Sequence, residues 1–403
     1  MEMASTGNIL SPAPPDSGRV EADRHPAIDR LFQCVLILLF LAGLGVPLVG
    51  TFLGWDPFEA FNEKRRLAAF PPWPSQYSQV RSYIPNVLSF YRDRFGFRDS
   101  LIHALMQVKV GVFHVSGSPE VIIGDNGWLF LRLRDDPNSF KFSPLAPLSE
   151  KELQDWQEMF ERRQAWLASQ HIAYLVLIAP EKQTIYPEFL SSELRRFQHN
   201  VRTDQLLDRL RETHSPVQIL DVRPELLQAK QFQRVYWKAD THWSDIGAYV
   251  VYRALMAEIQ RILPAKPLIV LQSADLTRVE AVGVGGDLAN MLGVPEMFSE
   301  TATTMTPTDQ TLPPRNGTDQ LYVLNGDPSG PRLVMYHDSF AHELIPLMAR
   351  SFSHAAYFWG KRAIYPQFIA MQKPDLVIDE IAERFVSGEP TDDSDLPGQA
   401  NPR

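Results

Sequence analysis

Cysteine is almost absent from this chain, whose 403 residues include only Cys34. One thiol cannot form an intramolecular disulfide or a cysteine metal cluster, so the fold must be stabilised by packing. Basic surface is also scarce, because the formal net charge is −9 and no lysine–arginine stripe is interleaved with aromatic residues. Nucleic acid is therefore not an expected partner. The glycine-rich "GVGGDLAN" at 283–290 does not fit a strand-to-helix phosphate loop, and no cofactor is predicted.

Long apolar runs are rare, with one exception between Leu31 and Trp55, which holds no charged residue. Roughly 20 apolar residues cross a ~30 Å hydrocarbon core, so the run predicts one transmembrane helix. A cleaved signal peptide would have a shorter apolar region, and a buried core helix is seldom so uniformly apolar. Lysine and arginine are nearly balanced on the two sides of the run, so charge alone leaves its orientation open.

The rest of the composition is that of a globular protein, with 44% hydrophobic and 22% charged residues. We expect five segments: a disordered tail at 1–30, the anchor at 31–55, a helical connecting segment at 56–120, a folded domain at 121–385, and a disordered tail at 386–403.

Strands and helices alternate along the predicted domain. A hairpin is expected at 121–132 around the turn Asp125–Gly127, followed by helices at 149–170, 201–214 and from Trp243 to about Leu263, with another near 341–351. Apolar runs predict strands at 173–180 and 217–222, then in "RLVMYHDSF", "AAYFWG" and "PDLVIDEIAE", whereas 264–330 is expected to be loop-rich. The pattern predicts an α/β fold with a mostly parallel sheet flanked by helices.

Three residues form a possible nucleophile set at the ends of these elements. Ser339 would stand at a strand-to-helix junction, and a serine hydroxyl needs a base such as His242, whose tautomer an acid such as Asp240 can fix. Structural roles compete with this interpretation. Ser339 could simply cap a helix, and Thr241 or Asp245 could cap the helix that follows His242.

Several stretches resemble the AlgJ/AlgX group of alginate O-acetyltransferases, a permuted relative of SGNH hydrolases. They are "DTHW" with a glycine four positions later, "HDSF" after an apolar strand, "GDNGWLFL" at 124–131, "APEKQTIYPE" at 179–188, "FNEKRRLAAFP" at 61–71 and "GGDLANMLG" at 285–293. In the family's order, they cover most of the chain from about 60 to 385. One departure is His337, which stands where a glycine often precedes the Asp–Ser pair.

The resemblance implies an SGNH-like catalytic domain in which Ser339 is the nucleophile, His242 the base and Asp240 the residue that orients it. It also implies an acyl-serine intermediate and transfer of acetyl to a hydroxyl of an exported polysaccharide. A membrane-bound O-acyltransferase would supply the acyl groups. The protein would then be a single-pass protein of the bacterial inner membrane, with its catalytic domain in the periplasm.

Further residues are weaker candidates. Lys182, Trp243, Gly286 and Asp287 could contact substrate or an oxyanion, and Lys182 could equally pair with a carboxylate. The aromatic "YFWG" at 357–360 could stack on sugars or belong to the core. A metal at Asp240 and His242 is not predicted, because no third ligand of HxH or HExxH type accompanies them.

The sequence therefore predicts a membrane-anchored periplasmic O-acetyltransferase with a serine–histidine–aspartate triad. Two alternatives stay open. The same residues could serve a polysaccharide acetyl esterase, or the protein could be a non-catalytic scaffold for polysaccharide export.

Overall fold

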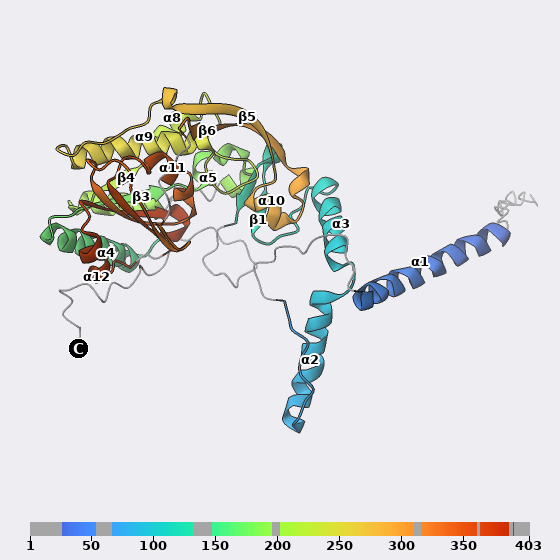
Figure 1. Ribbon diagram of the computed structural model, residues 1–403. Helices are drawn as coiled ribbons and strands as arrows, with labels where there is room; N and C mark the ends of the chain where they lie inside the picture. The colour runs from blue at the N-terminus through green and yellow to red at the C-terminus, as the bar shows by residue number, and fades with distance from the viewer. Residues whose placement is uncertain are drawn as a thin grey trace, which may run out of the picture. The chain divides into compact units, whose positions relative to one another are not determined.

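The computed structural model describes residues 26–53, 67–132, 147–195, 202–309, 316–360, 363–386 and 390 (Figure 1). Two compact units divide the chain: the first holds helices α1 and α2 and the start of α3, and the second begins at Ile102. The predicted terminal tails fall almost entirely outside the described residues. The sequence motifs for catalysis all belong to the second unit.

Helix α1 (Pro26–Leu53) contains the predicted membrane segment. Its stretch Arg30–Thr51 is long and apolar enough to cross a bilayer by length and composition, and most of it is exposed in the structure. The first unit continues with α2 (Tyr77–Arg94) and the start of α3 (Arg98–Gly111). These helices fall in the segment expected to be helical, and α1 is compatible with a single-pass anchor.

A seven-stranded sheet organises the second unit. Its spatial order is β4-β3-β11-β9-β10-β8-β7, and its first five strands are parallel. The antiparallel β8 and β7 at one edge make the sheet mixed rather than purely parallel. The strands are β3 (Ala173–Ala179), β4 (Ile219–Asp221), β7 (Asn316–Gly317), β8 (Leu321–Leu324), β9 (Arg332–His337), β10 (His354–Trp359) and β11 (Leu376–Ala382).

Both faces of the sheet are buried, which explains the continuously apolar strands. In β3, Leu175 and Leu177 pack on one face, whereas Tyr174 and Val176 pack on the other. The first face is covered by α5 (Lys182–Ile185), α8 (Arg223–Ala229), α9 (Asp245–Ile262) and α11 (Ile345–Met348), and the second by α4 (Glu150–Ser169), α7 (Arg202–Glu212) and α12 (Pro366–Gln372). The predicted α/β class is confirmed.

Local signals fixed several elements correctly. The helix expected at 149–170 is α4, which Ser149 caps in a capping box with Glu152. The antiparallel hairpin of β1 (Val121–Ile123) and β2 (Leu129–Leu131) turns through Asp125–Gly127, where Asn126 and Gly127 both have positive φ. The short helix α6 (Ser192–Arg195) precedes α7.

The prediction that residues 264–330 are loop-rich was wrong. It contains a long antiparallel pair, β5 (Leu276–Val284) with β6 (Ser299–Pro307), and between them α10 (Asp287–Leu292). Strand β6 is rich in threonine and half-exposed, so it lacks the apolar run on which the prediction relied. The helix expected near 341–351 is instead the 3₁₀ turn η5 (Ser339–His342) followed by the short α11.

The carboxyl ends of β3, β11 and β9 lie side by side, because β11 pairs with both of the others in parallel. Just beyond these ends come Lys182, Glu383 and Ser339. Open α/β sheets bind ligands at this edge, where the strand order reverses. The topology therefore places Lys182 and Ser339, two of the predicted site residues, at one edge of the sheet.

Candidate active site

The loop before α9 carries the proposed base. Its ends are joined by a bridge between Tyr236 and Trp243, and Ser244 caps α9 by accepting a hydrogen bond from the Gly247 N–H. Neither Thr241 nor Asp245 caps this helix, because the Asp245 carboxylate accepts from the Met305 N–H. His242 is thus held two residues before a rigid cap.

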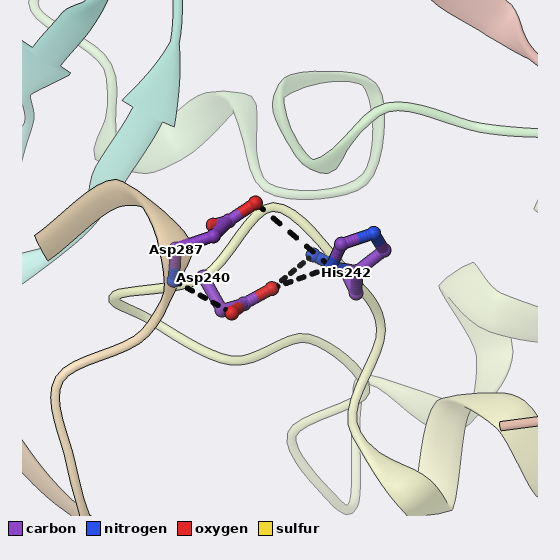
Figure 2. Close-up of side chains that lie close together, drawn as sticks. All are labelled: Asp240, His242 and Asp287. Carbon is purple, nitrogen blue, oxygen red and sulfur yellow. Dashed lines mark hydrogen bonds and ion pairs between the residues drawn. The ribbon is translucent and has the colours of Figure 1, made fainter. Parts of the chain in front are cut away.

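Asp240 lies in contact with His242, the proposed base. Its Oδ1 lies 2.6 Å from His242 Nδ1 and also accepts from the His242 backbone N–H at 2.9 Å (Figure 2). The other ring nitrogen, Nε2, is buried and has no hydrogen-bond partner among the described residues. This arrangement leaves Nε2 available for a proton from a substrate or a nucleophile.

The electrostatics of the pair favour a charged imidazole. Burial raises the pKa of Asp240, but the hydrogen bonds and charge of His242 outweigh burial and lower it to about 2. Burial likewise lowers the pKa of His242, and the hydrogen bond and charge of Asp240 outweigh it, so the pKa lies above its ordinary value. A base with this carboxylate behind it is strengthened for proton transfer.

Asp287 supports the loop from the side of α10. Its Oδ1 accepts from the Thr241 N–H at 2.7 Å and its Oδ2 accepts from the Thr241 hydroxyl, while its own N–H donates to Asp240 Oδ2 at 2.8 Å. Figure 2 shows dashed lines from both Asp240 and Asp287 to His242. Asp287 is therefore a structural partner of the proposed base, 4.0 Å from His242 Nδ1.

Gly286 permits this close approach. A Cβ on Gly286 would lie 2.4 Å from the Ala239 carbonyl oxygen and 3.0 Å from Asp240 Cβ, and its φ of +146° is one that glycine favours. The neighbouring Gly285 and Asp287 N–H groups already donate to Phe298 O and to Asp240. Of these three N–H groups, Gly286 alone has no acceptor within the described residues.

Lys182 is placed differently from the predicted substrate contact. Its side chain is buried, and its Nζ donates to the carbonyl oxygens of Trp237 at 3.1 Å, Lys238 at 2.9 Å and Asp240 at 2.5 Å. Burial lowers the pKa of Lys182 to about 7 against the opposing charges of nearby carboxylates, Asp240 foremost. All three ammonium hydrogens can thus be used by the loop, which indicates a positioning role.

Glu300 of β6 holds the same loop through its amides. Its carboxylate accepts from the Lys238 N–H at 3.1 and 3.0 Å and from the Ala239 N–H at 3.3 Å, and it forms a 2.9 Å ion pair with Arg234. The loop that carries His242 is therefore clamped on its carbonyls by Lys182 and on its amides by Glu300. Sequence reasoning missed Glu300 because it missed β6.

Ser339 begins the 3₁₀ turn η5 after β9, as the apolar strand predicted. The cap of this turn is Asp338, whose Oδ1 accepts from the Phe340 N–H at 3.0 Å, so Ser339 does not cap it. Asp338 is fixed in turn by the Ala382 N–H and by Glu380, which accepts from the Asp338 N–H at 2.8 Å. Burial, followed by the Asp338 charge, raises the pKa of Glu380 well above its ordinary value.

Phe340 joins the two halves of the site. Its ring lies edge-on to His242 at 5.0 Å and to Trp243 at 4.8 Å, and the Arg384 guanidinium lies 5.4 Å above it. Trp243, a predicted substrate contact, is fully buried in this packing. No hydrogen bond joins Ser339 to His242 within the described residues, so packing of Phe340 is the contact that brings the two segments together.

The comparisons agree with this architecture. The model of a family described as "SGNH hydrolase-like domain, acetyltransferase AlgX" matches residues 121–343, which is more than half of the chain. The chain belongs to this family. The AlgJ/AlgX resemblance seen in the sequence motifs is thereby confirmed.

Relatives of this AlgX family share part of their length with the chain. The probable alginate O-acetylase AlgJ of Azotobacter vinelandii is 30% identical over 190 residues, which are 46% of this chain and 44% of AlgJ. AlgJ of Pseudomonas aeruginosa is 29% identical over 193 residues, which are 47% and 45%. The matches thus span less than half the length of these relatives. PatB1 of Bacillus cereus has a similar fold, with a TM-score of 0.53 and 17% identity over 66% of this chain and 97% of PatB1.

The AlgX-family site also contains three groups whose spacing could suit a cation. The ligand atoms of Asp240, His242 and Asp287 lie within 4.8 Å of one another, so the structure supplies the third group that the sequence did not. Each carboxylate oxygen of Asp240 and Asp287, however, already accepts a hydrogen bond from the protein. This bonding fits an orienting network better than a metal site.

Glu343 was also missed by sequence reasoning. Burial raises its pKa to about 7, opposed by the charge of His242, and its Oε2 is buried without a hydrogen-bond partner among the described residues. It lies four positions after Ser339, but a single glutamate after a serine carries no signal that sequence reading could use. The structure adds it as a second titratable group near the imidazole.

Proposed function

We propose that this protein is an O-acetyltransferase that moves an acetyl group through an acyl-serine at Ser339 to a hydroxyl of a polysaccharide. The observation that carries the proposal is the 2.6 Å contact from Asp240 to His242 Nδ1, which leaves the opposite nitrogen, Nε2, without a protein partner. Family membership, the placement of Ser339 at the ligand edge of the sheet and its freedom from a capping role support the same function.

In the first half-reaction Ser339 Oγ attacks the carbonyl carbon of an acetyl donor while its proton passes to His242 Nε2. The bond from the acetyl carbon to the donor's leaving oxygen then breaks, and that oxygen takes the proton from Nε2. Asp240 stabilises the imidazolium between these two transfers, and it stays ionised because its pKa is about 2. The products are acetyl-Ser339 and the free alcohol of the donor.

The second half-reaction runs through the same groups. A sugar hydroxyl gives its proton to His242 Nε2 and attacks the acyl-serine, and Ser339 Oγ leaves with that proton. The Gly286 N–H is our candidate donor for the oxyanion that forms in both halves, because it has no acceptor among the described residues. The result is an O-acetyl sugar and a regenerated serine.

We infer that α1 anchors the enzyme as a single-pass protein of the bacterial inner membrane, with the domain on the periplasmic side. A membrane-bound O-acyltransferase would supply the acyl groups, and the acceptor would be an exported polysaccharide, since the relatives bear the name alginate O-acetylase. The full chain should stay in the membranes after alkaline washing, and protease added outside spheroplasts should digest the domain. Protection of the domain from this protease would place it in the cytoplasm instead.

An activated acetyl ester tests the chemistry. The full chain in detergent, mixed with p-nitrophenyl acetate and quenched, should gain the mass of one acetyl group on the peptide that contains Ser339. Ser339→Ala should gain none and should release nitrophenol at the uncatalysed rate. Equal rates for the two proteins would refute the acyl-serine mechanism and leave the scaffold interpretation.

Adding an oligosaccharide separates the transferase from the esterase. A transferase should release acetyl-Ser339 faster when the acceptor is present and should yield acetylated sugar. An esterase, which uses the same residues, would release acetate at a rate that the sugar does not change.

A further inference from the structure

A second cluster of rings lies beside the proposed nucleophile. Trp359, the last residue of β10, stacks against His342 with ring centroids 4.7 Å apart and an interplanar angle of 16°. His337, the last residue of β9, pairs with Trp359 in register and turns its ring edge-on to it at 5.5 Å. Trp359 is half-buried and His342 is exposed, so this pair reaches the surface.

The alternation of the strands places this cluster on the face of the sheet that carries His242. Tyr357 and Met335 belong to the core beneath α9, and Phe358 and Tyr336 belong to the core of the opposite face. Side chains two apart along a strand share a face, so Trp359 and His337 project to the same side as Tyr357. The cluster is the outward continuation of that face at its ligand edge.

The 3₁₀ turn brings the cluster close to Ser339. Side chains at positions i and i+3 of such a turn eclipse one another, and Ser339 and His342 are the first and last residues of η5. With about 2 Å of rise per residue, they are separated by roughly 6 Å along the axis. This separation is comparable to the size of one monosaccharide.

We propose that His342 and Trp359 form a stacking subsite for a pyranose ring of the acceptor chain, next to the ring whose hydroxyl receives the acetyl group. One face of a pyranose presents C–H groups, which pack on the electron-rich face of an aromatic ring. His337 packs edge-on against Trp359. The subsite rests on the proposed function for the identity of its ligand, but its existence can be tested by binding alone.

Binding is measured with the full chain in detergent carrying Ser339→Ala, so that no turnover occurs. The probes are a mannuronate hexasaccharide and a neutral cellohexaose, titrated by calorimetry. Trp359→Ala should weaken the better probe roughly tenfold, since an aromatic contact contributes about 0.5–1.5 kcal/mol beyond the area it buries. Trp73→Ala, which removes an 81% exposed tryptophan from the first unit, is the matched control and should bind as the parent does.

His342→Ala guards against misfolding, because His342 is exposed and its loss should leave the sheet intact. It should also weaken binding, whereas Trp359→Phe should retain most of it. In the active protein, Trp359→Ala should raise KM for the hexasaccharide.

Unchanged affinity in both Trp359→Ala and His342→Ala, with wild-type thermal stability, overturns the subsite even if acetyl transfer occurs. Loss of binding in the two variants supports the subsite even if Ser339 never becomes acetylated, in which case the transferase proposal alone fails. Preference for the mannuronate probe over cellohexaose would identify an anionic acceptor, and equal binding would identify stacking without charge recognition.

Discussion

The two halves of the proposed catalytic set are held in contrasting ways. The half that carries Asp240 and His242 is fixed on every side by side chains: Lys182 binds its carbonyls, Glu300 binds its amides and Asp287 binds Thr241. The half that carries Ser339 is fixed through its neighbours, because Asp338 caps the turn and Phe340 packs beneath it, while no hydrogen bond to the Ser339 hydroxyl occurs in the described chain.

The contrast fits a division of labour between orientation and reaction. A base must keep one tautomer and one direction through both half-reactions, so a clamped loop suits it. A nucleophile must change its bonding at each step, and a hydroxyl committed to a structural hydrogen bond would have to break it first. The clamp gives the buried Lys182 and Glu300 a role in positioning the loop.

Removing the base should have the largest effect. His242→Ala should slow acetylation of Ser339 about a thousandfold, because general-base assistance is worth 10²–10⁴ in rate. Stopped-flow release of nitrophenol measures it. The double variant with Ser339→Ala should be no slower than Ser339→Ala alone, since residues that act as a unit are not additive. A further loss in the double variant would show that His242 acts elsewhere.

The second largest effect is expected from a methyl group added at the contact between α10 and the loop that carries His242. Gly286→Ala should lower the free energy of unfolding by about 2 kcal/mol, because its Cβ would meet the Ala239 carbonyl in a backbone conformation that alanine rarely adopts. Chemical denaturation measures the change. Gly127→Ala is the control: its φ of +77° is also positive, but nothing lies within 4 Å of the added Cβ. An equal loss in both would leave φ alone as the cause.

Replacing Lys182 tests whether its hydrogen bonds to the loop carbonyls position His242 for catalysis. Lys182→Met keeps the buried aliphatic length and removes three hydrogen bonds to the loop, so kcat for p-nitrophenyl acetate should fall roughly tenfold with little change in KM. Lys230→Met is the control, because Lys230 also binds a backbone carbonyl, that of Ile185, away from His242. A change in KM alone would favour the substrate contact originally expected of Lys182.

The smallest effect concerns the charge of Asp287. Only neutral His242 accepts a proton, so kcat/KM should rise with pH through a pKa above 6.5. Asp287→Asn removes one of the charges that raise this pKa, and the rise should move to lower pH. The pH–rate profiles of the two proteins check it, and a shift to higher pH would contradict the assigned electrostatics.

Stability should follow the same titration with the sign fixed by linkage. Because the folded pKa of His242 is raised, its contribution to stability is fully present below the unfolded pKa and is lost as pH rises through the folded value. Asp240 contributes in the opposite sense: its stabilisation is present above the unfolded pKa and is lost as pH falls toward about 2. Denaturation of the wild type at several pH values measures both.

The sequence predicted the central strands because burial on both faces leaves a signature that can be read locally. Strands β3, β9 and β11 are short apolar runs bounded by turn residues, and the turn residues Asp125–Gly127 indicate the hairpin. Strands β5 and β6 were not predicted, because they pair mainly with each other and are half-exposed. The connection between them also contains a helix and not a tight turn.

The site could be predicted only as far as its partners are close in sequence. Asp240 and His242 are two residues apart, so their contact follows from local geometry. The contacts of Lys182 and Glu300 with the loop could not be predicted, because both side chains bind backbone atoms and every sequence has the same backbone atoms. The cap is Asp338 and not Ser339, for which a capping role had been left open, and sequence alone does not separate the two because aspartate and serine are both good caps.

The position of β11 has a consequence for how the protein is made. This strand is the last of the sheet in the chain and lies between β3 and β9, so those two strands stay unpaired on that side until residue 382 has been synthesised. Pairings so distant in sequence form slowly. Until then the sheet is incomplete between the strands that precede Lys182 and Ser339, so the proposed site can form only late in folding.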